Sequence, residues 1–348
     1  MEAQDALNRT TQLLWLAVTL SLLAGLPACK QTQKGGNGRP PVARCMEDLD
    51  NIPELAALKA RDKGRPEDAQ GKPLEGLEIA LTINDQVRSS GDPDDLDNWC
   101  EHEDSRENFD RLVAALREHQ MPPTVDFAIG QNLDPQLAEA WVASGNLLGS
   151  MTYSRKKPNK TGVDEFVNDL ARNDQALAAY WKPEAKSPKY FRFPKFKVSM
   201  APQDQARIEK YLSDNGYTVV PATVDAHDEK FSWIYCAASA RGDAACSNLV
   251  KAYFKSLLLD TTLKARESAR QIAGREVKHV LVFRANQFTC DNLAELLAWY
   301  KSLGARFIPL ADALADPFYK MVDEDGMPAG LKVFRKVKSS QAEQDPRP

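Results

Sequence analysis

The strongest constraint on the fold is a regular alternation of short apolar runs with amphipathic stretches, which begins at residue 77. The apolar runs predict strands at residues 77–83, 125–129, 147–150, 190–193, 217–224, 279–283 and 306–308. The stretches between them predict helices at 104–119, 135–143, 163–180, 204–213, 231–273 with a break at Gly242, and 291–302. Strands that alternate with helices in this way predict an α/β fold built on a parallel sheet or barrel.

The composition is that of a soluble globular domain with a sizeable core. The 348 residues are 43% hydrophobic and 27% charged, and the formal net charge is −4. Nucleic-acid binding is driven by clustered excess Lys and Arg, so this charge balance argues against a nucleic-acid partner. With four histidines in the chain, a histidine-rich metal site would use most of them.

The N-terminus has the pattern of an exported lipoprotein. The apolar run at 13–25 is too short to span a bilayer, and it is followed by Leu-Pro-Ala and then Cys29, which resembles the lipobox of bacterial lipoproteins. We therefore expect residues 1–28 to be a signal peptide and Cys29 to be lipidated. The expected location is the bacterial cell envelope, on the periplasmic or outer-membrane face, with the lipid anchor as the only membrane attachment. An ordinary secreted protein and an uncleaved anchor are the alternatives.

The remaining chain divides into three segments. Residues 29–74 begin with a polar stretch rich in Gly and Pro and are expected to form a tether and an N-terminal segment. Residues 75–320 contain the alternating pattern and are expected to form a single domain. Residues 321–348 are expected to form a C-terminal tail.

Lipidation of Cys29 would leave five cysteines, so at least one of them must stay unpaired within the chain. An envelope location permits disulfides. We expect Cys236 to pair with Cys246, because both flank the turn between two helical patterns. Buried free thiols are the alternative.

In parallel α/β folds, chemistry is concentrated in the loops that follow the carboxyl ends of the strands. Five segments end in such loops: IALTINDQ at 79–86, GSMTYSR at 149–155, FRFP at 191–194, TVDAHD at 223–228 and VLVFRAN at 280–286. In this order they resemble the five motifs of the polysaccharide deacetylase family, the NodB-homology domain, over about residues 75–320. The resemblance implies a distorted (β/α) barrel whose relatives remove N- or O-acetyl groups from chitin-like glycans, peptidoglycan or xylan.

The resemblance also implies a metal-dependent reaction, in which an Asp and two His hold a divalent ion and a second Asp acts as base. By position, Asn84 replaces the base, and the metal positions are Asp85, Met151 and Arg155. A thioether is a poor ligand for such an ion, and a guanidinium is always charged. A unit charge about 4 Å from a dication costs on the order of 8 kcal/mol at an effective dielectric constant of about 20. We therefore expect no bound metal and negligible deacetylase activity.

The remaining motif residues suggest what the site has become. Arg284 stands where the resemblance places the acid His, and Asp225 stands where its orienting Asp would be, so we predict an ion pair between them. Arg155, Arg192 and Lys195 would add positive charge to the same groove. We expect this groove to bind glycan, including anionic sugars, through a planar arginine fork. The alternative is that these charges pair with neighbouring aspartates and bind nothing.

Four aromatic and two histidine side chains complete the set of candidates. Stacking on sugar rings and packing in the core are the two alternatives for Trp99, Tyr153, Tyr190 and Trp233. His119 and His279 are expected to be structural.

The sequence thus favours a catalytically inactive envelope relative of the polysaccharide deacetylases that needs no cofactor and binds glycan, peptidoglycan or a partner. One alternative is an active or residual carbohydrate N- or O-deacetylase, with zinc or another divalent metal held by displaced ligands such as His102 or His227. The other is a protein-interaction scaffold. The glycan, the membrane leaflet and the oligomeric state are not specified by these patterns.

Overall fold

The computed structural model describes most of the domain that the sequence predicts. The described residues are 41–60, 71–85, 87, 105–181, 188–194, 202–322, 328–330 and 332–333. The predicted signal peptide, Cys29, Trp99, His102 and Lys195 lie outside these residues. None of the helices in the described ranges has the length and apolar character needed to cross a membrane.

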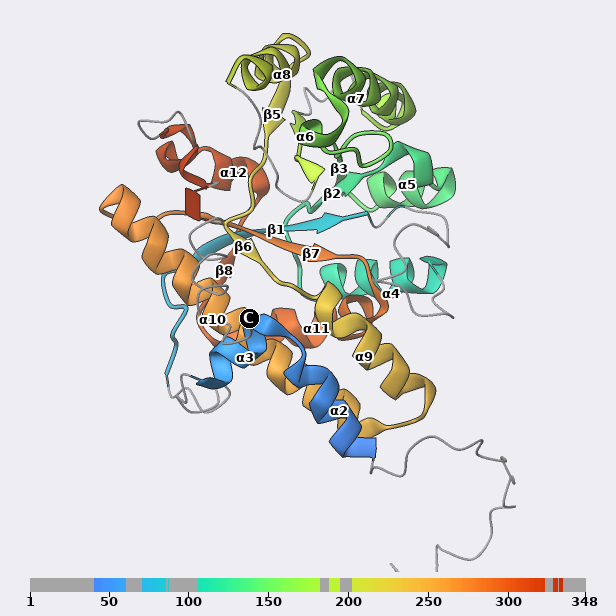
Figure 1. The fold of residues 1–348 in the computed structure, drawn as a ribbon, viewed down its shortest axis with the longest axis vertical. Helices are drawn as coiled ribbons and strands as arrows, with labels where there is room; N and C mark the ends of the chain where they lie inside the picture. The colour runs from blue at the N-terminus through green and yellow to red at the C-terminus, as the bar shows by residue number, and fades with distance from the viewer. Residues whose placement is uncertain are drawn as a thin grey trace, which may run out of the picture. The chain divides into compact units, whose positions relative to one another are not determined.

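Eight parallel strands form the centre of the fold (Figure 1). They are β1 (Glu78–Asn84), β2 (Val125–Ala128), β3 (Leu147–Ser150), β4 (Lys189–Phe191), β5 (Tyr217–Val219), β6 (Val224–Asp225), β7 (His279–Arg284) and β8 (Arg306–Phe307). Their order is β5-β4-β3-β2-β1-β7-β6, and β8 pairs with the start of β1. All pairs are parallel, and every connection between successive strands except the one from β5 to β6 contains a helix that crosses a face of the sheet.

The sheet is curled into a half-barrel, the distorted (β/α) barrel that the sequence predicts. Its two outer strands, β5 and β6, are joined by residues 220–223 alone, so the ends of the sheet lie close together. Val220 N donates to Phe191 O of β4 (2.7 Å), whereas Thr223 N donates to Val280 O of β7 (3.0 Å). The single strand expected at 217–224 is therefore wrong: the chain crosses there from one end of the sheet to the other. Pro221, which has no N–H to donate, lies in the crossing.

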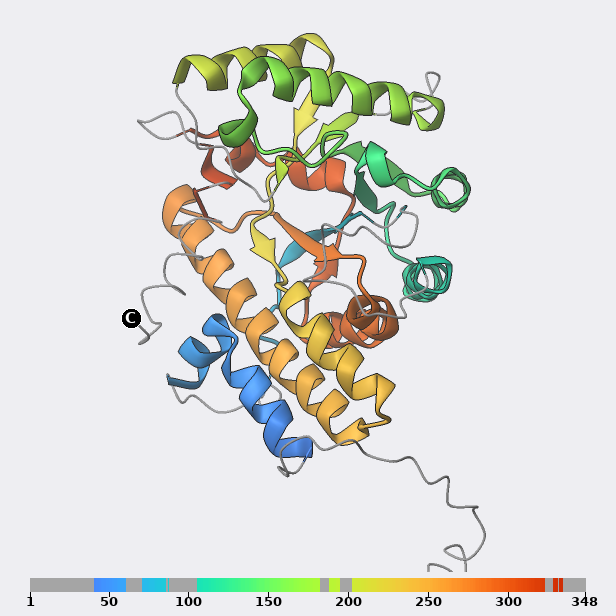
Figure 2. The ribbon, with the colours of Figure 1, turned by 45° about the vertical axis from the view of Figure 1, so that its right-hand side comes forward.

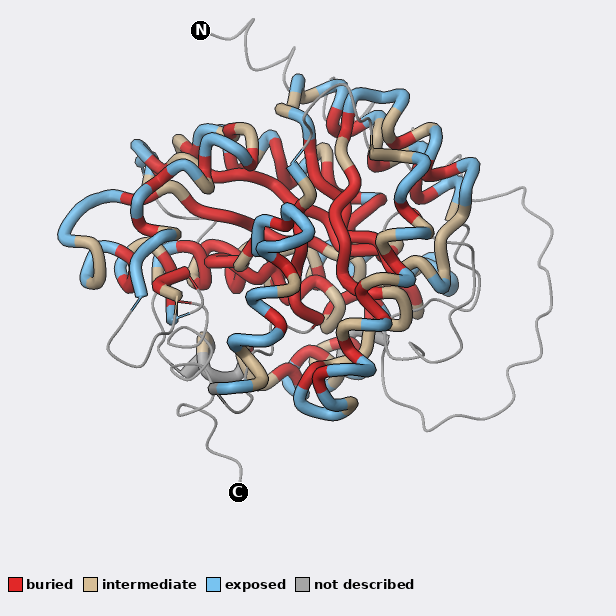
Figure 3. Tube along the Cα trace, turned by 90° about the horizontal axis from the view of Figure 1, so that it is seen from above, coloured by how far each residue is buried: buried red, intermediate tan, exposed pale blue. Residues whose placement is uncertain are grey.

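Eleven α-helices are assigned within the described residues and surround the strands. They are α2 (Pro41–Asp50), α3 (Pro53–Ala60), α4 (Ser105–Glu118), α5 (Pro135–Ala143), α6 (Pro158–Thr161), α7 (Val163–Leu177), α8 (Pro202–Asp214), α9 (Glu229–Ala240), α10 (Ala244–Ala273), α11 (Gln287–Ser302) and α12 (Leu310–Leu314). Figure 3 shows the strands as a continuous buried centre with the exposed residues on the surrounding helices.

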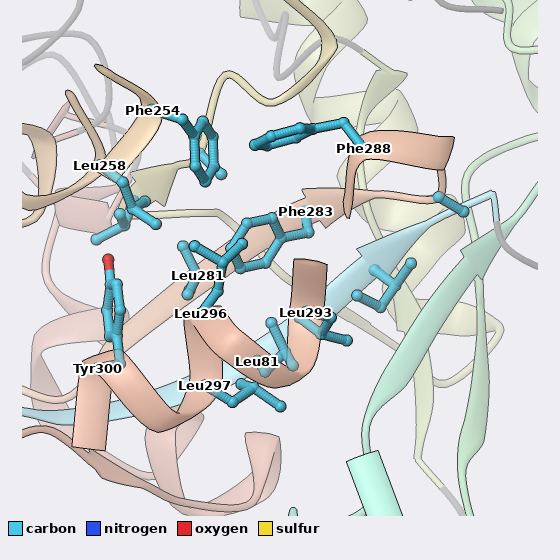
Figure 4. Packing of buried hydrophobic residues seen from close by; sticks show 14 of the residues in the cluster. Leu81, Phe254, Leu258, Leu281, Phe283, Phe288, Leu293, Leu296, Leu297 and Tyr300 are labelled. Carbon is cyan, nitrogen blue, oxygen red and sulfur yellow. The ribbon is translucent and has the colours of Figure 1, made fainter. Parts of the chain in front are cut away.

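Two apolar layers lie on opposite faces of the curled sheet. The larger layer packs alternate residues of the strands against the helices; in Figure 4, Leu281 and Phe283 of β7 meet Phe254 of α10 and Phe288 of α11. The smaller layer fills the barrel interior, where it includes Ala80, Val125, Phe127, Met151 and Val280. Parallel strands that are buried on both faces explain why the strand segments read as continuous apolar runs.

The N-terminal segment contributes structure that the sequence analysis does not predict. Helices α2 and α3 pack beside α9 and α10 (Figure 2), and Leu49 and Leu55 are fully buried. At the other end of the chain, Ala329 and Val333 are buried as well. The compact unit begins at Pro41, so it extends beyond the predicted limits of 75 and 320.

The predicted pairing of Cys236 with Cys246 is wrong. Cys246, at the start of α10, forms a disulfide with Cys45 of α2. Cys236 is also disulfide-bonded, and Cys290 is a buried thiol. The two cysteines beside the α9–α10 turn belong to different bonds, because α2 lies against this helix pair and brings Cys45 to Cys246 from 201 residues away.

Candidate functional site

The carboxyl ends of β1, β6 and β7 bring three of the predicted motifs together. Asn84 is in register with Phe127 of β2 and with Arg284 of β7, and Asp225 is in register with Val282. Residues in register on parallel strands point to the same face of the sheet. The side chains of Asn84, Asp225 and Arg284 therefore face the barrel interior at its carboxyl end.

Arg192, which follows β4, occupies the interior itself. Its side chain is fully buried, with Nη1 donating to Asn84 Oδ1 and Nη2 to Thr82 Oγ1, both at 2.9 Å. Its guanidinium also lies 3.9 Å from the ring centroid of Phe127, a cation–π geometry. Burial lowers the pKa of Arg192 to about 9. The expectation that Arg192 lines a groove open to ligand is therefore wrong, since its donors bond within the core.

A glycine makes room for this arrangement. Gly149 of β3 is in register with Phe127, and a Cβ at position 149 would lie 2.8 Å from the Phe127 ring. The ring against which Arg192 packs thus occupies the space that any larger residue at position 149 would fill.

Arg284 is surrounded by carboxylates. Its Nη1 lies 2.8 Å from Asp225 Oδ1, 3.1 Å from Asp228 Oδ1 and 2.8 Å from Glu229 Oε2, and its Nη2 donates to Asp225 Oδ2 (3.2 Å). The predicted ion pair between Asp225 and Arg284 is thus present, in bidentate form. Because the fork of Arg284 is engaged within the chain, it is not available in this structure to bind an anionic sugar.

Backbone and side-chain donors complete the surroundings of Asp228. This fully buried carboxylate accepts hydrogen bonds from Arg284 N (2.9 Å), Asn286 Nδ2 (2.8 Å) and Thr289 Oγ1 (2.7 Å). Asn286 also caps α11, because its Oδ1 accepts from Thr289 N. The fifth motif is thereby joined to the fourth at the start of α11.

The charged groups of this cluster shift one another's pKa values. Burial alone would raise the pKa of Asp225, but Arg284 and His227 hold it well below its usual range. Burial alone would lower the pKa of Arg284, but Asp225, Glu229 and Asp228 raise it well above its usual range. The Asp225–Arg284 pair is therefore ionised at neutral pH.

Contacts of His227 and Lys230 connect the cluster to helix α3. His227 N donates to Asp225 Oδ1 (3.1 Å), and its Nδ1 lies 3.8 Å from Asp225 Oδ2. Lys230, in the first turn of α9, forms an ion pair with Glu54 of α3. Burial would raise the pKa of Glu54, but Lys230 and His227 lower it.

The loop of the second motif is held by α7. Asp169 accepts from Ser154 N (2.9 Å) and Ser154 Oγ (2.8 Å), and Asn173, one turn later, bonds with Ser150 Oγ (2.8 Å) and Gly130 N (2.7 Å). These contacts set the position of Met151 and Arg155 relative to the strands.

Backbone strain is concentrated at the site. Five non-glycine residues in the described ranges have positive φ, and four of them lie in the motif loops: Asp85 (62°), Thr152 (92°), Arg155 (58°) and His227 (56°). Such conformations cost about 1–3 kcal/mol each and gather at functional sites. A β-branched residue at φ 92° is the least expected of them.

The three positions that the resemblance assigns to a metal do not fit one. Asp85 offers a carboxylate, but Met151 is 2% exposed and packs in the apolar interior layer. Arg155 brings a fixed positive charge and no acceptor atom. Of these three residues, only Asp85 offers a suitable metal ligand.

A second group has suitable donors but holds a cation already. Ligand atoms of Asp225, His227 and Glu229, here called the Asp225 triad, lie within 4.8 Å of one another. Arg284 Nη1 lies 2.8 Å from a carboxylate oxygen of both acids in this triad. A dication would therefore face a guanidinium bound to two of its three ligands, and the triad does not fit a metal while Arg284 is present.

Most of these residues lie in the five motifs, but some of their partners do not. Glu229 and Lys230 directly follow the fourth motif, and this adjacency was the available signal. Glu54 carried no such signal, because it lies 176 residues before its partner Lys230. Of the aromatic candidates, Tyr190 is buried, Arg172 stacks on Tyr153, and Trp233 is exposed.

Comparisons with known proteins agree with the fold. Residues 74–220 match the family model described as polysaccharide deacetylase. This range contains the first three motifs and ends before the fourth. No curated protein matches the chain.

Several solved structures are similar to this chain at low identity. A polysaccharide deacetylase from Bacillus cereus is 20% identical (67% of this chain and 91% of that chain covered, TM-score 0.45). A CE4 family pseudoenzyme from Bacillus anthracis is 15% identical (75% and 80%, TM-score 0.44). A chitin deacetylase from Colletotrichum lindemuthianum is 16% identical (71% and 89%, TM-score 0.45). At these values the likenesses carry no weight in the functional argument.

Proposed function

We propose that this chain is a non-catalytic member of the polysaccharide deacetylase family that binds a glycan in the cell envelope, and the match of residues 74–220 to the family model supports this. One observation carries the proposal: protein cations occupy the interior of the site. Arg192 donates to Asn84, at the position of the base, and Arg284 fills the position of the acid. A site in which the base is an amide and the acid is a permanent cation cannot transfer a proton in either direction.

The retained frame supports binding as the remaining role. The strained loops, the capping Asn286 and the contacts from α7 keep the motif loops in a defined arrangement. A family whose members act on polysaccharides makes a glycan the first partner to test. A protein partner that uses the barrel as a scaffold is the outcome to consider if no glycan binds.

The disulfides support an oxidising compartment. Cys45–Cys246 joins two helices in the core of the fold, and Cys236 is bonded too. Structural disulfides form and persist in the envelope and outside the cell and are rare in the cytosol. The lipid anchor at Cys29 is proposed from the lipobox-like sequence.

The test of inactivity measures metal and turnover on one preparation. The full-length chain, purified without chelator, is analysed for zinc, cobalt and nickel and then incubated with each metal and acetylated chito-oligosaccharides. We expect substoichiometric metal and no release of acetate. A 1:1 metal content together with turnover would refute the proposal and favour a residual deacetylase that uses the Asp225 triad.

A matched variant checks the assignment of positions. Asn84→Asp, Met151→His and Arg155→His together restore the donors that the resemblance expects. We expect this variant to gain zinc affinity relative to the wild type, measured by calorimetry. No gain in a variant with an unchanged circular dichroism spectrum would contradict the placement of the metal positions.

A further inference from the structure

We infer that Trp233 is the platform on which an uncharged sugar ring of the bound glycan stacks, an inference that rests on the proposed glycan binding. Trp233 is 44% exposed, and it is the one aromatic side chain in the exposed class among the described residues. Its neighbours Phe231 and Ile234 are fully buried, so α9 presents its other large side chains to the core. An indole with this exposure is a large apolar surface that the described part of the chain leaves open.

Helix geometry places this indole beside the site. Trp233 lies four residues after Glu229 and three after Lys230, so all three share one face of α9. Long side chains on a helix lean toward its N-terminus, which directs Trp233 toward that first turn. Glu229 contacts Arg284 at the carboxyl end of the barrel. Trp233 therefore lies about one helical turn, or roughly 5 Å along the helix axis, beyond Glu229.

This combination has the chemistry of a sugar subsite. The apolar face of a pyranose ring stacks on an indole, and the indole Nε1–H is a donor for a hydroxyl group. Glu229 offers a carboxylate acceptor and Lys230 an ammonium donor on the same helix face. Both are already held by partners, Arg284 and Glu54, so their positions are fixed before a ligand arrives.

The local charge favours a neutral ring. Three carboxylates, Asp225, Asp228 and Glu229, outnumber the two guanidinium groups of Arg284 and Arg192, and the Glu54–Lys230 pair is balanced. A uronate or another sugar carboxylate would approach a surplus of negative charge. The ligand class is therefore an uncharged sugar such as an N-acetylhexosamine, in place of the anionic sugar that the sequence suggests.

The experiment measures binding of the full-length chain to chitopentaose by calorimetry and to purified peptidoglycan by co-sedimentation. The variants are Trp233→Ala, Trp233→Phe, which keeps an aromatic ring, and Leu263→Ala, a matched control on α10 that removes a side chain of similar exposure (37%). We expect Trp233→Ala to weaken binding at least about tenfold. We expect Trp233→Phe to stay within about threefold of the wild type, the control to be unchanged, and all melting temperatures to agree.

The outcomes separate the two proposals. If the wild type binds neither probe, the proposed glycan binding fails and the platform fails with it. If the wild type binds and Trp233→Ala binds equally well, glycan binding stands and the platform is wrong. Binding to chitopentaose that disappears between 50 and 500 mM salt would also overturn it, because stacking on an uncharged ring is not screened by salt.

Discussion

Replacing Arg284 with Met tests whether this guanidinium is the counter-ion of the buried acids. The substitution keeps an unbranched side chain of similar length and removes the charge that contacts three carboxylates. The side chains of Asp225 and Asp228 are 8% and 0% exposed, so water cannot replace the lost partner. We expect the free energy of unfolding at pH 7.5 to fall by about 3–5 kcal/mol, the usual effect of leaving buried charges uncompensated.

The pH dependence gives the sign of the effect. In the wild type, Arg284 holds the pKa of Asp225 below its unfolded value, so this stabilisation is present above about pH 4 and is lost as the pH falls further. In Arg284→Met the pKa of Asp225 rises above its unfolded value, and the pKa of Asp228, which burial already raises to about 6, rises further. The variant should therefore become less stable as the pH rises from 4 to 7.5, and the difference from the wild type should be smallest near pH 4.

The assay is urea unfolding followed by far-ultraviolet circular dichroism at pH 4.5, 6 and 7.5. Arg207→Met is the matched control, because Arg207 forms an ion pair with Asp164 in which both side chains are largely exposed. This control should unfold like the wild type at each pH. A loss below about 1 kcal/mol for Arg284→Met at pH 7.5, or a loss that does not change with pH, would refute the counter-ion role.

Three further predictions concern the Asp225 triad, the Cys45–Cys246 disulfide and His279. Arg284→Met frees the Asp225 triad, so zinc should raise the melting temperature of this variant and leave that of the wild type unchanged; an equal effect on both would show that Arg284 does not block the triad. Cys45→Ser removes the disulfide that links two residues 201 positions apart, and the chain-entropy model gives such a bond a stabilisation of at most about 5 kcal/mol. We expect the free energy of unfolding in urea to fall by about 2–4 kcal/mol. An unchanged unfolding midpoint would contradict a structural role for this bond. Burial lowers the pKa of His279 to about 4, so the unfolded chain binds a proton before the folded chain does as the pH falls from 6.5 to 4, and about 3 kcal/mol of folding stability is lost across that range. His279→Leu should remove this part of the pH dependence of the unfolding free energy. An unchanged slope of that free energy against pH would exclude His279 as its source.

Local patterns predicted most of the barrel, because strands buried on both faces and helices with one apolar face have distinct periods. Helix α5 and strand β3 have the predicted bounds, since Pro135 follows the capping Asp134 and β3 is short and apolar. The division of residues 217–224 into two strands was not visible, because it depends on which strand each half pairs with. That pairing is a property of the closed sheet.

A contact of the site was predicted where the residue types at two motif positions determine it, and it was missed where it depends on residues from other parts of the fold. The Asp225–Arg284 pair follows from opposite charges at two motif positions that the resemblance places together. The burial of Arg192 does not follow from its sequence, since an arginine after a strand is usually exposed. It is buried here because Asn84, Thr82 and the Phe127 ring converge on it from two other strands. The Glu54–Lys230 pair joins segments that no local pattern relates.

The covalent link between α2 and α10 also determines how the domain carries mechanical load. A pull transmitted through the residues before Pro41 reaches Cys45 within about one helical turn and passes through the sulfur bridge into the first turn of α10. Helix α10 has 30 residues and is anchored along its length by buried side chains, so the force acts on the whole core at once. After reduction, the same pull would peel α2 away from α9 and α10 before it strained the barrel.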